Sequence, residues 1–192
     1  MVQSITSMQA DLGRVGFTLV VIGLLAVALA VIGWVHRRGS QRAATTVSAV
    51  GFAVVVVGVL SLTLFGPQPP SVAEPQLFLD PLEGARGWTA IAWNPVLDNV
   101  ALFVPVGAMA AALWWRRSVV AVWLVCLAIS VGIEAFQYLV PTGRVANTAD
   151  VIANGVGAAV GILLAVALGA RAAAVRAATR AEARGVGEVR RR

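Results

Sequence analysis

Five long apolar segments dominate this chain of 192 residues. A helix needs about 20 residues to cross the roughly 30 Å hydrocarbon core of a bilayer. We place five such spans at residues 15–35, 43–65, 95–115, 118–140 and 149–169. Only 12% of the residues are charged, whereas a soluble domain usually has about 25%. The alternating segments of about 10 residues that build a membrane β-barrel do not occur. The sequence therefore predicts an all-α, polytopic membrane protein with about five transmembrane helices.

The placement of arginine predicts how the chain is oriented, since short loops rich in Lys or Arg stay in the cytoplasm. With five spans, the basic segments all fall on one side and contain Arg37, Arg38, Arg42, Arg116, Arg117, Arg171, Arg176, Arg180, Arg184, Arg190, Arg191 and Arg192. The other side receives only Arg14, Arg86 and Arg144. We therefore expect the N-terminus outside and the C-terminus in the cytoplasm.

The formal net charge of +6 is attributed to membrane contact and not to nucleic acid. Arginines near an anionic lipid surface are worth about 1 kcal/mol each. The alanine- and arginine-rich residues after Arg171 predict that the last helix continues as a surface helix.

The chain divides into four parts. We assign a two-helix transmembrane hairpin to residues 1–66, an extracytoplasmic loop to 67–94, a three-helix transmembrane domain to 95–170 and a basic cytoplasmic tail to 171–192. The hairpin consists mainly of Val, Leu, Ala and Gly, and we interpret it as facing lipid or packing on the other spans. The loop carries Trp88 and ends near Trp93, which suits the membrane interface. It is interpreted as a partial lid or as a simple spacer.

Polar residues gather inside or at the ends of the last three spans. Ionisable groups are costly in hydrocarbon, so such a residue is a candidate for a functional site. In the third span, Asn94 as N-cap and Pro95 as first helical residue predict that the helix starts there. Asp98 then lies near a helix N-terminus, where the dipole favours an anion. Asn99 and Phe103 follow on one face.

The fourth span carries its polar residues on a single helical face. Ser130, Glu134 and Gln137 are spaced i, i+4 and i+7. With the helix ending near Val140, a rise of 1.5 Å per residue puts Glu134 roughly 9 Å below the outer boundary. The lone Cys126, in the middle of this span, is interpreted as a packing residue.

The fifth span has a comparable stripe. Asp150, Asn154, Gly157 and Gly161 share one face, and glycines at this spacing let helix backbones approach closely. The short preceding loop makes the fourth and fifth spans neighbours and brings Arg144 within reach of Asp150 or Glu134. All three helices thus place polar groups in the outer third of the bilayer.

Two interpretations of this cluster remain open. Polar contacts between membrane helices contribute on average about 0.6 kcal/mol, so the residues serve either packing or function. Glu134, Asp150 and Arg144 together cost more than packing requires, and we favour a functional site. The only histidine, His36, lies on the opposite side, which excludes histidine-based chemistry at the cluster. We predict no metal site and no cofactor.

The last three spans resemble the VanZ-like family. Residues 99–107 are similar to its motif N-x-x-L-F-x-P-x-G, and residues 130–137 to its motif S-x-x-I-E-x-x-Q. Arg144, Asp150, Asn154 and Gly157 resemble its C-terminal pattern, although Asn147 stands where the family often has an acid. The resemblance covers about residues 94–169, and the first two spans match only as hydrophobic segments.

The resemblance implies a cell-envelope role in the bacterial cytoplasmic (inner) membrane but no particular reaction. The family is named for a protein associated with resistance to the glycopeptide teicoplanin. Teicoplanin carries a lipid tail, which suits a site open to the outer leaflet. The expected partners are membrane lipids and a lipid-linked envelope precursor or a lipoglycopeptide, with no nucleic acid; the oligomeric state is left open.

Three functions are compatible with these residues. The favoured one is binding of an amphiphilic envelope ligand by Asp98, Asn99, Phe103, Ser130, Glu134, Gln137, Arg144, Asp150 and Asn154. The second is a membrane hydrolase or transferase with Glu134 and Asp150 as acid/base residues; the two carboxylates are also ligands that a divalent cation accepts. The third is a small proton-coupled transporter in which Glu134 titrates. It is the weakest, because the polar residues stop in the outer third.

Overall fold

The computed structural model describes residues 2–37, 41–65, 77–80, 90–114, 117–140 and 146–189. These contain five helices: α1 (Val2–Arg37), α2 (Gln41–Phe65), α3 (Ala90–Leu113), α4 (Val119–Leu139) and α5 (Thr148–Val189). Each has a segment long and apolar enough to cross a membrane: Gly16–Val35, Arg42–Thr63, Val96–Leu113, Val119–Leu139 and Thr148–Arg180. The prediction of an all-α membrane protein with five transmembrane helices is confirmed.

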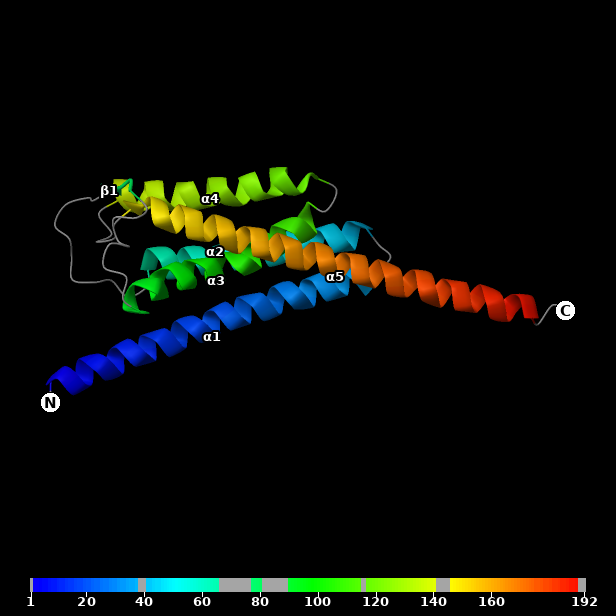
Figure 1. The fold of residues 1–192 in the computed structure, drawn as a ribbon, viewed down its shortest axis with the longest axis horizontal. Helices are drawn as coiled ribbons and strands as arrows, with labels where there is room; N and C mark the ends of the chain where they lie inside the picture. The colour runs from blue at the N-terminus through cyan, green and yellow to red at the C-terminus, as the bar shows by residue number, and fades with distance from the viewer. Residues whose placement is uncertain are drawn as a thin grey trace.

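The helices lie side by side and alternate in direction, so the chain runs back and forth along one axis (Figure 1). The end of α2, the start of α3, the end of α4 and the start of α5 meet at one end of the bundle. We call it the polar end, because it carries Asp98, Glu134 and Asp150. The opposite end, called the arginine end, carries Arg117, Arg171 and Arg176.

Two short strands connect distant parts of the chain at the polar end. β1 (Leu77–Phe78) pairs in parallel with β2 (Ala146–Asn147), with Leu77 opposite Ala146 and Phe78 opposite Asn147. This pairing attaches the segment between α2 and α3 to the start of α5.

Helix α3 is the centre of the bundle, since it packs against each of the other four helices. Its large side chains Leu102, Phe103, Val106 and Met109 are almost completely buried. Lipid tails are as apolar as these side chains, so membrane helices associate mainly through close van der Waals packing. The central position of α3 maximises that packing.

The closest approach in the bundle is between α3 and α5. A Cβ atom at Gly157 would overlap the carbonyl oxygen of Val100, and one at Gly161 would overlap that of Val104. Gly107 of α3 lies equally close to the backbone of α5. The prediction that glycines of the fifth span permit close helix packing is confirmed, and their partner is α3.

The predicted start of the third helix is wrong. Helix α3 begins at Ala90, so Asn94 and Pro95 lie inside it, and the last residues of the segment predicted as a loop are helical. Alanine and other apolar residues ahead of Asn94 extend a helix readily. A proline in the second turn removes only one backbone hydrogen bond, that to the carbonyl four residues earlier.

The last helix continues beyond the membrane-spanning length, as predicted. Helix α5 runs without interruption to Val189 and projects past the other helices at the arginine end (Figure 1). Arg171, Arg176 and Arg180 are exposed along this extension. Its placement on a membrane surface stays a prediction.

Candidate functional site

The buried face of α4 carries the polar residues that its spacing predicts. Ser130, Glu134 and Gln137 are buried on the same face as Cys126 and Ile133. Only 9% of the surface of Glu134 is exposed. A buried polar group is costly unless it is hydrogen-bonded, so the partners of these side chains define what they do.

Glu134 holds the backbone at the start of α5. Its Oε2 atom accepts a hydrogen bond from the backbone N–H of Asn147 at 2.9 Å. The side chain of Asn147 accepts in turn from the backbone N–H of Ala149 at 2.9 Å, as an N-cap residue does. The carboxylate thus lies beside a helix N-terminus, where the helix dipole stabilises negative charge.

Asn154 connects α5 to α4 deeper in the bundle. Its Nδ2 atom donates to the hydroxyl of Ser130 at 2.9 Å, and both side chains are buried. The Oδ1 atom of Asn154 is buried without a hydrogen-bond partner. Further toward the arginine end, the indole N–H of Trp123 donates to the carbonyl of Gly155 at 2.9 Å, which further fixes α4 on α5.

Gln137 connects α4 to α2, a contact that the sequence did not predict. Its side-chain amide donates to the backbone carbonyl of Thr63 at 3.1 Å. Thr63 lies in the last turn of α2, where carbonyls have no donor within their own helix. The contact is consistent with the interpretation that the first two spans pack on the rest of the protein, and it adds a backbone carbonyl of α2 to the polar cluster. The sequence contained one indication of this contact, because the predicted second span ends at the same depth as Gln137.

Other polar side chains at the polar end are more exposed, and we call this set the polar rim: Asp98, Asn99, Asn147, Thr148 and Asp150. Asp98 is exposed, and the other four are half-buried. The Thr148 hydroxyl donates to the carbonyl of Phe78 at 3.2 Å, which links the rim to β1. The sequence did not identify Thr148, and it treated Asn147 only as a departure from the family pattern.

The structure separates the predicted site residues into two groups. Ser130, Glu134, Gln137 and Asn154 make contacts inside the bundle, whereas Asp98, Asn99 and Asp150 reach its surface at the polar end. Phe103 has no exposed surface, and its Cβ faces the close approach at Gly157. Its role as a ligand contact stays a prediction.

Two predictions fall on residues that the structure does not describe. Arg144 lies outside the described residues, so its reach to Glu134 or Asp150 stays a prediction. Most of the loop interpreted as a partial lid, namely residues 67–76 and 81–89, is also outside them. Within the described part of the chain, no group of three His, Cys, Asp or Glu side chains is arranged to hold a metal ion.

Exposed leucines occur on several elements at the polar end. Leu79 after β1, Leu97 on α3 and Leu139 on α4 expose 71%, 57% and 76% of their surfaces. An amphiphilic molecule lying along this end would find polar and apolar partners together.

Comparisons with known proteins identify the family. No curated protein and no solved structure matches the chain. The family model described as VanZ/LLP1 matches residues 17–169, from the apolar part of α1 into α5. This match extends well beyond residues 94–169 and includes the first two spans, which resembled the family only as hydrophobic segments. The multi-pass membrane protein described here belongs to the VanZ/LLP1 family.

Proposed function

We propose that this protein binds a lipid-linked or amphiphilic ligand of the bacterial cell envelope at the polar rim, which opens to the outer leaflet of the cytoplasmic membrane. The observation that carries the proposal is the polar rim itself. Side chains from α3, β2 and α5 reach the surface at the polar end of the bundle, which also carries exposed leucines.

The buried contacts support this assignment, because they separate buried residues that hold the backbone in place from exposed residues that a ligand can reach. Glu134 and Gln137 hydrogen-bond to backbone atoms of other elements, so they fix the geometry of the polar end. Packing explains these buried residues. Asp98 and Asp150 keep exposed surface at the polar end, where a ligand can reach them, and charge in a membrane protein is costly.

The chemistry of the rim favours a ligand headgroup that donates hydrogen bonds. Ionised Asp98 and Asp150 only accept hydrogen bonds, whereas the amides of Asn99 and Asn147 can donate and accept. Hydroxyl and ammonium groups of a sugar-bearing or amino-bearing headgroup fit such a surface. A lipoglycopeptide such as teicoplanin combines polar sugars with a lipid tail, which would lie on the exposed leucines.

An enzyme acting on the same class of lipid is the second candidate. It is favoured by two carboxylates in different environments, the buried Glu134 and the half-buried Asp150, because such environments separate an acid from a base. Turnover of a bound lipid by the purified protein would support this candidate.

The test is mass spectrometry of the lipids that remain bound to the purified full chain. Wild type is compared with Asp98→Asn and Asp150→Asn, which keep the side-chain shape and remove the charge. Ser61→Ala is the matched control, because this exposed hydroxyl near the end of α2 donates only to the carbonyl of Val57 in its own helix.

We expect one glycosylated or amino-bearing envelope lipid to be enriched on wild type and on Ser61→Ala, and lost from both aspartate variants. Circular dichroism and size-exclusion chromatography confirm that all four proteins are folded. If all four retain the same bulk lipids, the proposal is wrong and the cluster serves packing. A parallel growth assay compares teicoplanin with vancomycin, and protection against teicoplanin alone would indicate capture of the lipid tail.

A further inference from the structure

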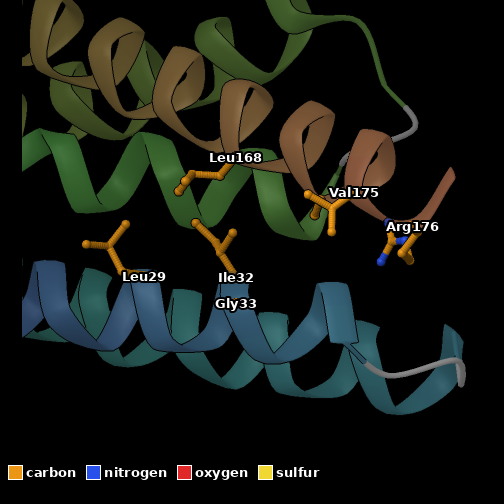
Figure 2. A pocket seen from close by; sticks show the side chains of 7 residues that line it. Leu29, Ile32, Gly33, Leu168, Val175 and Arg176 are labelled. Atoms are coloured by element: carbon orange, nitrogen blue, oxygen red, sulfur yellow. The ribbon is translucent and has the colours of Figure 1, made fainter. Parts of the chain in front are cut away.

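A pocket of about 590 Å³ opens between α1 and α5 at the arginine end, away from the polar rim. Its walls come from two helices (Figure 2) and consist of Leu29, Ile32, Gly33, Leu168, Ala172, Val175 and Arg176. The volume falls in the range of small-molecule sites, about 300–1,000 Å³. The lining is apolar except at Arg176.

The pocket has an apolar floor and open sides. Ile32 is 2% exposed and forms part of the floor, whereas Leu29 and Leu168 expose 42% and 39% of their surfaces. Figure 2 shows Leu29 and Ile32 projecting from α1 toward Leu168 of α5, with Arg176 at one end of the row. On α5, Leu168, Ala172 and Arg176 repeat every four residues and therefore share one face.

The position along the helices places this pocket at the edge of the hydrocarbon core. The apolar segment of α1 ends at Val35, so Leu29 and Gly33 lie in its last two turns. Arg176 lies eight residues beyond Leu168, roughly 12 Å further along the helix axis. Helical side chains point back toward the helix N-terminus, which directs the guanidinium toward the headgroup layer.

The charge around the pocket selects an anion. Helix α5 carries no acidic residue between Asp150 and Glu182, and the apolar segment of α1 carries none either. Arg171 and Arg180 are exposed on the same helix. Arginine binds phosphate bidentately with charge-assisted hydrogen bonds, and its apolar stem can lie along the pocket wall.

We propose that this pocket binds an anionic phospholipid, with one acyl chain between α1 and α5 and the phosphate on Arg176. An acyl chain fills an apolar gap that opens into the membrane, and the arginine at its rim selects the headgroup. The site is distinct from the proposed ligand site at the polar rim. Most of its α5 wall lies beyond residue 169, where the family match ends.

Native mass spectrometry of the delipidated full chain in detergent tests the proposal. The protein is titrated with phosphatidylglycerol or with phosphatidylcholine of identical acyl chains. Arg176→Gln removes the headgroup contact, and Arg171→Gln is the control with the same charge change outside the pocket. Gly33→Leu fills the pocket, and a Cβ at Gly33 meets no atom within 4 Å, so the fold accommodates it.

We expect wild type and Arg171→Gln to prefer phosphatidylglycerol, and Arg176→Gln to bind it about tenfold more weakly, since one charged hydrogen bond is worth at least that factor. Gly33→Leu should reduce binding of both lipids. If Arg176→Gln and Arg171→Gln lose the same affinity for phosphatidylglycerol, the lipid is attracted by the total positive charge of α5 and not bound by Arg176, and the proposal is overturned. Unchanged binding by Gly33→Leu, or a dimer that this substitution dissociates, would also overturn it.

Discussion

The carboxylate of Glu134 accepts a hydrogen bond from the backbone N–H of Asn147, 13 residues further along the chain, at 2.9 Å. Asn147 also caps α5, and its neighbours Thr148 and Asp150 belong to the polar rim. One buried carboxylate therefore fixes the backbone that carries the β2 and α5 residues of the rim. In the proposed function Glu134 is a positioning residue, and the rim residues contact the ligand.

Substituting Glu134 should separate hydrogen bonding from charge. Glu134→Ala leaves the N–H of Asn147 without its acceptor, which costs about 1–3 kcal/mol when the group is buried. Glu134→Gln keeps an acceptor of the same shape and should lose less than half as much. SDS-induced unfolding in mixed micelles measures both free energies.

The same two variants test the positioning role. We expect Glu134→Gln to retain the bound lipid and Glu134→Ala to lose it together with stability. If Glu134→Gln stays as stable as wild type but loses the lipid, the carboxylate contacts the ligand directly.

The contact of α3 with α5 should tolerate no added methyl group. Gly161→Ala would drive a Cβ into the backbone carbonyl of Val104, and backbone cannot move aside as a flexible side chain does. Overpacking of this kind typically costs about 1–3 kcal/mol. We expect a loss of stability in that range, measured by the same unfolding assay.

Gly132→Ala is the matched control for this prediction. Gly132 lies on the exposed side of α4, and a Cβ there meets no atom within 4 Å. Alanine is up to about 1 kcal/mol better than glycine in a helix, so this variant should be as stable as wild type or more so. Equal effects at the two positions would contradict the close approach.

Hydropathy identified the spans, and sequence periodicity identified the faces of the helices. Hydropathy located the apolar segments to within a few residues of those in the structure, apart from the longer last one. The spacing of Ser130, Glu134 and Gln137 placed them on one face of α4, which is buried. Both properties depend on local sequence and on the thickness of the bilayer.

Pairing between helices could not be derived in this way. Periodicity says which residues share a face, but it does not say which helix that face meets. The partnership of Gly161 with α3 and of Gln137 with the Thr63 carbonyl depends on the packing of the whole bundle. The start of α3 at Ala90 was missed because Asn94 and Pro95 form a strong local start signal that the longer helix overrides.

The hydrogen bond between Asn154 and Ser130 should make a small but measurable contribution. Both side chains are buried, and the bond is 2.9 Å long. Comparable contacts between membrane helices contribute about 0.6 kcal/mol on average in double-mutant cycles. We expect that coupling energy from Ser130→Ala, Asn154→Ala and the double variant.

The unpartnered Oδ1 atom of Asn154 sets the expected size of the single effect. Asn154→Ala removes a buried acceptor that has no hydrogen bond and so relieves a desolvation cost. Ser130→Ala instead leaves the buried Asn154 amide N–H without its acceptor. We therefore expect Asn154→Ala to destabilise the protein less than Ser130→Ala. The reverse order would show that Oδ1 has a partner, such as a buried water molecule.

Cysteine labelling should establish which side of the membrane carries the polar rim. The native Cys126 has no exposed surface and should not react with a maleimide until the protein is denatured. Asp80→Cys places a thiol at the polar end, and Thr179→Cys places one on the exposed extension of α5.

The arginine-rich loops predict that the α5 extension lies in the cytoplasm. In intact spheroplasts, a membrane-impermeant maleimide should therefore label the Asp80→Cys variant alone, and it should label both variants after permeabilisation. Labelling of Thr179→Cys alone in intact spheroplasts would put the polar rim on the cytoplasmic side and contradict a site that opens to the outer leaflet.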